Sequence, residues 1–182
     1  MKKLYFVRHG QTVWNEEDRI CGETDSPLTE KGHRQAVELA EKIKSRLEEG
    51  LSIDEMLYSP LSRAKDTAQH IHELTGIPMR SEKRLLEQRF GFFEGTTRFG
   101  KEFQESKQHF ADDYRGGESM LKLAQRVYNL LDELSEDEKV YLLVAHNGIA
   151  RMTNSYFHSL TNEQYATYRM GNCEIAEYVY GE

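Results

Sequence analysis

The sequence predicts an α/β fold, in which helices pack against a layered sheet. Short apolar runs rich in Val, Leu, Tyr and Phe, which are typical of buried strands, recur along the chain. Between them lie segments whose apolar residues repeat at helical spacing, and this alternation indicates helices that connect the strands of one sheet. A length of 182 residues, without an internal repeat or a composition shift, favours a single domain over residues 1–182.

Five apolar segments are expected to form the strands. Residues 3–7 and 140–144 are the clearest, and the continuous apolar run of the latter favours a central place in the sheet. Shorter strands are expected over residues 56–59, 79–81 and 175–180. The first of these strands begins almost at the start of the chain, and the last ends almost at its finish.

Helical periodicity predicts the elements between the strands. Segments 29–49, 121–134 and 149–157 carry apolar residues three or four positions apart, as amphipathic helices do. The remaining expectations are a helix through Ala64, Ala68 and Ile71 that ends near Gly76, a short helix suggested by Phe99, Phe103 and Phe110, and loops over residues 10–28 and 91–100.

Composition limits the possible partners and the location. The 31 acidic and 24 basic residues give a net charge of −7, which argues against general binding of nucleic acid or of anionic membranes. The only cysteines, Cys21 and Cys173, make no disulfide framework, which favours a reducing compartment. The basic N-terminus lacks the apolar run of a signal sequence, and no stretch reaches transmembrane length. We therefore expect a cytoplasmic protein.

Two of the predicted strands end in a histidine that a glycine follows closely. Open α/β sheets bind ligands at the carboxyl ends of their strands, so such histidines point into a crevice. Imidazole can act as nucleophile, acid, base or metal ligand, but an adjacent guanidinium indicates an anionic partner and argues against a metal ion. The two strand ends read Arg8-His9-Gly10 and Ala145-His146-Asn147-Gly148.

A third strand end adds a second guanidinium. The segment 56–59 leads into a turn with Pro60 and Ser62, after which Arg63 opens a helix. A helix N-terminus is itself a favourable place for an anion. If the three strand ends are neighbours, Arg63 joins the residues of the other two ends around one crevice.

These motifs, taken in order, resemble the histidine phosphatase superfamily, also called the phosphoglycerate mutase-like family. The resemblance covers most of the chain and implies a three-layer α/β sandwich, with a mostly parallel central sheet and helices on both faces. The blocks that carry it are Arg8-His9-Gly10-Gln11-Thr12-Val13-Trp14-Asn15, Gly22 with Asp25-Ser26-Pro27-Leu28-Thr29 and Gly32, Ser59-Pro60-Leu61-Ser62-Arg63-Ala64 with Thr67-Ala68, Glu87 with Phe90-Gly91 and Glu94-Gly95, Gly117-Glu118-Ser119, and His146-Asn147-Gly148 with Arg151.

The resemblance also implies roles for individual residues. His9 is the expected nucleophile that becomes phosphohistidine, and Glu87 is the expected acid that protonates the leaving group and later deprotonates water. The guanidinium pair is expected to supply the positive charge, without a metal ion or other cofactor. The residues expected to hold the phosphoryl group are Arg8, Asn15, Arg63, His146 and Asn147, together with the backbone amides of Cys21 and Gly22.

Simple electrostatics adds a pH expectation. His9 must attack as the neutral imidazole, and two nearby guanidinium groups should lower its pKa. Glu87 must carry a proton for the first step, so its pKa should be raised by burial or by bound phosphate. The two requirements together predict an acidic to neutral rate optimum.

Several alternatives stay open at this point. Glu94 lies close to Glu87 in the sequence and could take the acid's place. The substrate is expected to be a small phosphorylated metabolite, hydrolysed by a phosphatase; the alternatives are a phosphoglycerate mutase that uses 2,3-bisphosphoglycerate, or a non-catalytic phosphate-binding module. The short interval from Glu87 to His146 favours the phosphatase. The oligomeric state is undetermined, and the residues whose part in specificity is open are Arg89, Arg98, Lys101 and Arg115.

Overall fold

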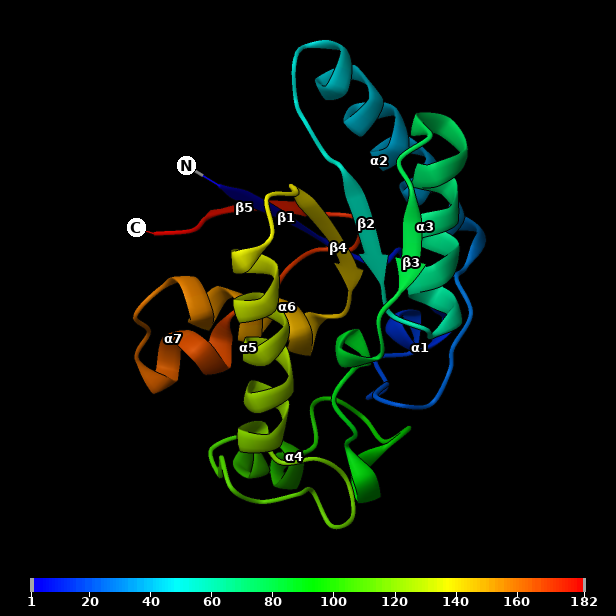
Figure 1. Cartoon of the computed structure of the whole chain (residues 1–182). Helices are drawn as coiled ribbons and strands as arrows, with labels where there is room; N and C mark the ends of the chain where they lie inside the picture. Colours follow the sequence, from blue (N-terminus) through cyan, green and yellow to red (C-terminus); the bar gives the residue numbers. More distant parts are fainter. Residues whose placement is uncertain (1, 182) are drawn as a thin grey trace.

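A single five-stranded sheet organises the protein, and the computed structural model describes it over residues 2–181. Neighbouring strands run parallel except at one edge, where the last strand is antiparallel to the first. The order across the sheet is β3-β2-β4-β1-β5 (Figure 1). The strands are β1 (Lys3–Arg8), β2 (Glu55–Tyr58), β3 (Met79–Ser81), β4 (Tyr141–Ala145) and β5 (Ile175–Val179).

The central strand is β4, as its uninterrupted apolar sequence predicts. All of its residues are buried, because it has strands on both edges and helices on both faces. It pairs with β1 in a register that sets Arg8 opposite Ala145. The next residues, His9 and His146, therefore leave the sheet side by side at its carboxyl edge.

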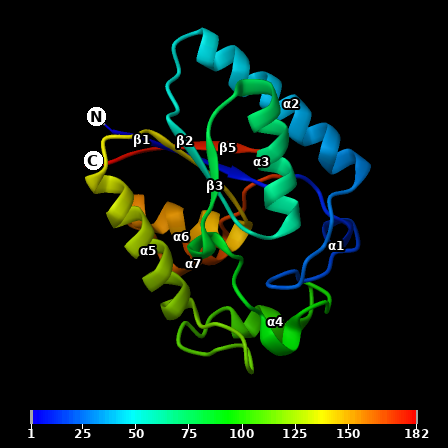
Figure 2. The same cartoon turned by 45° about the vertical axis from the view of Figure 1, so that its right-hand side comes forward.

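Helices cover both faces of the sheet, so the predicted three-layer sandwich is confirmed (Figures 1 and 2). Alternate residues of β1 enter different cores: Leu4 and Phe6 pack in one cluster, whereas Tyr5 and Val7 pack in the other. The helices α2 (Glu30–Glu48) and α3 (Ser62–Thr75) cover the Tyr5 side, and α5 (Met120–Glu136) and α6 (Asn147–Phe157) cover the Phe6 side.

The long elements lie close to the predicted ranges. The helix expected over residues 29–49 begins one residue later, since Thr29 is its N-cap and its hydroxyl accepts a hydrogen bond from the amide of Gly32. The helix expected to end near Gly76 does so, and this glycine adopts a left-handed conformation with φ of 74°. The short helix expected near Phe103 is α4 (Lys101–Ser106).

Some short elements escape the sequence prediction. The stretch 10–28, expected to be a loop, contains α1 (Val13–Glu16), and α7 (Asn162–Thr167) follows α6. Both are short helices that begin at a threonine capping box, so they carry too little periodicity to stand out. Short 3₁₀ turns also occur at η1 (Lys83–Leu85) and η2 (Gly91–Phe93). Among residues 2–181, none of the helices combines the length and the apolar character that a membrane span requires.

Candidate active site

The imidazole of His9 is held in one tautomer. Its ring is 4% exposed, and its Nδ1 lies 2.7 Å from the carbonyl oxygen of Gly10. A carbonyl oxygen only accepts hydrogen bonds, so Nδ1 carries the proton and Nε2 carries the lone pair. The Gly10 amide in turn donates to the hydroxyl of Thr67 on α3, which fixes the turn that follows β1.

The surroundings of His9 keep this ring neutral. Burial lowers its pKa well below the usual value, and the positive charges of Arg63 and Arg8 lower it further. The opposing contribution, from the hydrogen bond to Gly10, is smaller. The expectation of a lowered His9 pKa therefore agrees with the structure, although burial rather than the guanidinium pair is the largest cause.

Arg8 extends from the end of β1 into the same cavity as His9. One of its terminal nitrogens, Nη1, donates to the carbonyl of Met170 at 2.6 Å, and its buried Nε has no partner within residues 2–181. Burial lowers the pKa of this guanidinium to about 10, against an opposing contribution from Glu87. The group is thus charged at neutral pH and has hydrogen-bond donors to spare for an anion.

Arg63 and His146 interlock behind His9. The Arg63 side chain is 1% exposed; its Nε donates to His146 Nδ1 at 3.2 Å, and its terminal nitrogens donate to the carbonyls of Gly22 and Thr24. His146 Nε2 lies 2.7 Å from the hydroxyl of Ser59, which completes the bonding of that ring. Both residues lie outside the cavity lining, so Arg63 reaches the site here through its charge and through the loop that it holds.

The two histidines are neighbours, as the register of β1 and β4 requires. Their ring centroids lie 5.2 Å apart in an edge-to-face arrangement. Burial lowers the pKa of His146 well below its usual value, and the Arg63 charge adds to the effect. His146 therefore stays neutral and accepts the Arg63 hydrogen bond at Nδ1.

Two asparagines line the cavity with their amide oxygens already engaged in hydrogen bonds. The Oδ1 atom of Asn15 accepts hydrogen bonds from the Thr12 amide and from Asn172, and the Oδ1 atom of Asn147 accepts one from the Met170 amide. Because their oxygens are engaged, the groups that these two lining residues can still offer a ligand are NH₂ donors. The structure thus gives Asn15 and Asn147 the polarity that binding of an anion requires.

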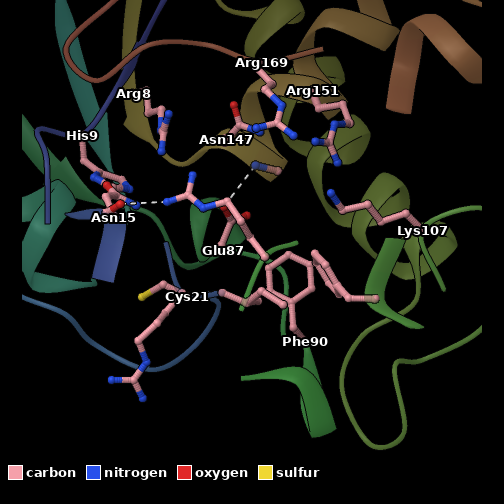
Figure 3. A pocket seen from close by; sticks show the side chains of 15 residues that line it. Arg8, His9, Asn15, Cys21, Glu87, Phe90, Lys107, Asn147, Arg151 and Arg169 are labelled. Atoms are coloured by element: carbon pink, nitrogen blue, oxygen red, sulfur yellow. Dashed lines mark hydrogen bonds between the residues drawn. The ribbon is translucent and has the colours of Figure 1, made fainter. Parts of the chain in front are cut away.

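Glu87 is a buried carboxyl group at the cavity wall. Its Oε1 accepts a hydrogen bond from the Gln88 amide at 2.9 Å. Its Oε2 accepts one from the Gly148 amide at 3.1 Å (Figure 3). Burial raises the pKa of Glu87, although these two hydrogen bonds and the Arg63 charge oppose the shift. A Cβ atom on Gly148 would lie 2.4 Å from Oε1, so glycine at this position allows the close approach.

Glu94, the rival acid, serves a different purpose. Its carboxylate accepts hydrogen bonds from the amides of Gly22, Glu23 and Phe90, and thereby ties the loop after α1 to the segment before η2. The Gly22 amide, expected to contact phosphate, is engaged in this way. Cys21 lines the cavity, and its thiol donates to the carbonyl of Thr24.

The cavity lined by Arg8, His9, Asn15, Cys21, Glu87 and Asn147 measures about 140 Å³, which suits a small ligand (Figure 3). Of the cations whose part in specificity the sequence leaves open, only Arg98 lines it; Arg89 bonds Gly117, while Lys101 and Arg115 pair with acidic residues outside it. The lining residues for which the sequence predicts no role are Arg19, Ile20, Phe90, Phe103, Lys107, Gly148, Arg151 and Arg169. Within residues 2–181, no group of three or more His, Cys, Asp or Glu residues has the arrangement of a metal site.

Curated relatives and solved structures resemble the protein over nearly its whole length. "Probable phosphoglycerate mutase GpmB" from Salmonella choleraesuis (strain SC-B67) is 34% identical over 192 residues, which cover 100% of this chain and 86% of the relative. The structure of a mycobacterial glucosyl-3-phosphoglycerate phosphatase with VO3 shares 28% identity at a TM-score of 0.85, covering 97% of this chain and 90% of the other. The protein TTHB049 from Thermus thermophilus shares 27% identity at a TM-score of 0.75, covering 98% of this chain and 94% of the other.

A family model gives the same result from the sequence. The model described as the histidine phosphatase superfamily (branch 1) matches residues 4–182. This range contains both strand-end histidines and every candidate site residue described above. The chain belongs to the histidine phosphatase superfamily.

Proposed function

We propose that the protein is a phosphatase that hydrolyses phosphate monoesters of small metabolites through a phosphohistidine at Nε2 of His9. The observation that carries this proposal is the hydrogen bond from Nδ1 to the Gly10 carbonyl, which leaves a neutral, nucleophilic nitrogen beside Arg8 and Asn15. Covalent catalysis suits phosphoryl transfer, because it divides one displacement into two in-line steps.

In the first step, the Nε2 lone pair attacks phosphorus while the bond from phosphorus to the ester oxygen breaks. Glu87 gives its proton to the leaving alkoxide, which its raised pKa supports. In the second step, Glu87 takes a proton from water, the resulting hydroxide attacks phosphorus, and the phosphorus–nitrogen bond breaks. Inorganic phosphate leaves, and both His9 and Glu87 return to their starting states.

The phosphoryl oxygens are held by groups of this chain. Arg8 and the amides of Asn15 and Asn147 supply donors directly, since all three line the cavity. Arg63 contributes charge from behind the nucleophile and, with His146, fixes the surrounding loops. In this mechanism the guanidinium groups supply the positive charge that stabilises the transition state, so no metal step is invoked.

A mutase is the second candidate, because the curated relatives carry phosphoglycerate mutase names. In that reaction the phosphoryl group on His9 would return to a phosphoglycerate, and 2,3-bisphosphoglycerate would prime the enzyme. A mutase must exclude water from the phosphoenzyme. The interval between Glu87 and His146 offers little chain for a longer lid, which favours hydrolysis.

A panel of phosphosugars, phosphoglycerates and nucleotide-derived esters tests the proposal. We expect phosphate release from at least one member by the wild-type protein and none by His9→Ala. Isomerisation of 3-phosphoglycerate in the presence of 2,3-bisphosphoglycerate, faster than phosphate release, would establish the mutase instead. If the protein catalyses neither reaction with any member of the panel, the phosphatase proposal is refuted. The remaining candidate is then a non-catalytic module that binds phosphate groups.

A further inference from the structure

Three cations line the cavity beyond Asn147 as seen from His9, and we call them the distal cation cluster: Lys107, Arg151 and Arg169. Lys107 is the C-cap of α4, Arg151 lies on α6, and Arg169 lies between α7 and β5. Figure 3 shows His9 and Asn15 at one side of the cavity and Lys107 at the other, with Glu87 and Asn147 between them. No acidic side chain within residues 2–181 forms an ion pair with any of the three.

The lack of ion pairs distinguishes this cluster from Arg98 and Arg19, which also line the cavity; Arg8, beside His9, likewise has no ion pair within residues 2–181. Arg98 lies 3.0 Å from a carboxylate oxygen of Asp18, and Arg19 lies 3.1 Å from one of Glu17. Those two arginines therefore have acidic partners within the protein, and their side chains also bond backbone carbonyls, while the buried Nε of Arg98 has no hydrogen bond within residues 2–181. The positive charges of the cluster have no acidic partner within residues 2–181, so they can pair with an anionic group of a ligand.

Arg151 shows the strongest sign of a missing partner. It is 8% exposed, and its Nε is buried without any hydrogen bond within residues 2–181. The one hydrogen bond that its side chain makes within residues 2–181 is long, 3.5 Å, from Nη2 to the Tyr168 carbonyl. Its guanidinium carbon lies 5.5 Å from the centre of the Tyr165 ring. A buried guanidinium is costly unless its donors are satisfied, and an anion in the cavity would satisfy them.

Lys107 lies close enough to the other two cations to be affected by them. Burial lowers the pKa of its ammonium to about 8, and the charges of Arg151, Arg169 and Arg98 contribute to that shift. The ammonium also lies 4.7 Å from the centre of the Phe103 ring, so one side of it faces an apolar wall. Repulsion among these cations is relieved when an anion binds between them.

We propose that the distal cation cluster binds a second anionic group of the substrate, a carboxylate or a second phosphate, while the first phosphate lies against His9. The proposal rests on the proposed function for the identity of the reacting end. The clustering of cations at both ends of one small cavity then selects compact phosphate esters that are anionic at both ends. Esters with a single anionic group, such as simple alkyl phosphates, lack the second group that would engage Lys107 and Arg151.

The affinity of the His9→Ala variant for small phosphate esters tests the role of the cluster without requiring turnover. Calorimetry would compare 3-phosphoglycerate with glycerol 3-phosphate, which differ in a carboxylate, and 1,3-propanediol bisphosphate with its monophosphate, which differ in a phosphate. We expect the ligand with two anionic groups in at least one pair to bind about 10- to 100-fold more tightly than its partner, as hydrogen bonds to charged groups predict. The pair with the larger ratio identifies the second group.

Two variants on the same background assign the preference to the cluster. Lys107→Met should lower the affinity ratio of the preferred pair, and Lys101→Met is its matched control, because Lys101 lies on the same short helix but is 91% exposed and pairs with Glu105. An unchanged ratio in Lys107→Met, equal affinities within both pairs, or binding of none of the four ligands would overturn the inference. A wild-type protein that shows the preference in binding but hydrolyses no ester would overturn the proposed function alone.

Discussion

The two ends of the cavity are built in opposite ways. At the His9 end, side chains follow the strands β1 and β4, and Arg63 and His146 have their polar nitrogens engaged by Gly22, Thr24 and Ser59 or by each other. At the other end, the distal cation cluster comes from a helix terminus, a helix and a connecting segment, and Arg151 keeps a donor without a partner in the described chain, residues 2–181. The reacting groups at the first end are thus held by the protein itself, apart from the buried Nε of Arg8, whereas the cations at the second end have no acidic partner within residues 2–181.

This difference separates chemistry from specificity within one cavity. The register of a sheet fixes His9 relative to His146, so the reacting groups are organised before a substrate arrives. The distal end depends on segments such as α4 and α7, which can differ among proteins that share the sheet. The following experiments, from the largest expected effect to the smallest, test whether the two ends are as different as they look.

Loss of the nucleophile should have the largest effect. We expect His9→Ala to reduce phosphate release by about 10⁴-fold or more, as removal of a catalytic nucleophile does elsewhere. Thermal unfolding measured alongside should show that the variant is folded. Residual activity within about tenfold of the wild-type level would mean that the His9 end does not carry the chemistry, and the comparison would fail.

Replacement of the acid should change both the rate and its pH dependence. We expect Glu87→Gln to lower kcat by about 10²- to 10⁴-fold. Protonated Glu87 is the active form, so the wild-type rate should fall as pH rises through the raised Glu87 pKa. Neutral His9 is also required, so the rate should fall again when pH drops through the lowered His9 pKa.

The pH–rate profile of kcat/KM measures both limbs. The wild-type optimum should lie on the acidic to neutral side, and Glu87→Gln should lose the decline at high pH. Glu94→Gln is the comparison variant, because its carboxylate holds backbone amides outside the reacting groups. A wild-type rate that climbs steadily to high pH would contradict the assignment of Glu87.

A smaller effect is expected when Glu87 is displaced rather than replaced. The Cβ atom of Gly148→Ala would lie 2.4 Å from Oε1 of Glu87, so the carboxyl group must move. We expect a loss of about 10- to 100-fold in kcat, the size that a misplaced catalytic group produces. Gly100→Ala is the control, because its Cβ atom would meet nothing closer than 3.4 Å. Equal rates in both variants would show that the His9 end tolerates movement.

The smallest effect concerns the packing behind the nucleophile. Ser59→Ala removes the acceptor of the His146 Nε2 proton and leaves a buried donor without a partner. We expect a loss of about 1–3 kcal/mol in the free energy of unfolding. Ser45→Ala, at an exposed position of α2, should change it by less than about 0.5 kcal/mol. Denaturant titrations compare the two, and equal values would indicate that His146 is held loosely.

Much of the fold could be predicted, because its long elements carry clear patterns. The apolar run of β4 indicates a strand buried on both faces, and the periodicity of α2 and α5 reflects one buried face each. Short elements such as α1 and α7 depend on capping by Thr12 and Thr161, and a few residues give no period to detect. Their positions could not be predicted from the pattern of apolar residues.

The site residues also differ in how far the sequence predicts them. Two histidines at strand ends indicate a shared crevice, since parallel strands deliver their carboxyl ends to one edge of a sheet. The orientation of Asn15, in contrast, depends on Asn172 near the other end of the chain, and no local signal announces that contact. Lys107 and Arg169 lie in segments without periodicity, so only the assembled fold places them beside Arg151.

The two oxygens of the Glu87 carboxyl group each have a backbone donor of their own, the amides of Gln88 and Gly148. When the carboxyl gains a proton, one oxygen becomes a hydroxyl and the donor facing it meets a weaker acceptor. The charge of the acid is thereby transmitted to the main chain at the start of α6. Nuclear magnetic resonance of those two amides would consequently follow the titration of Glu87 in the native sequence, with no label or mutation inside the cavity.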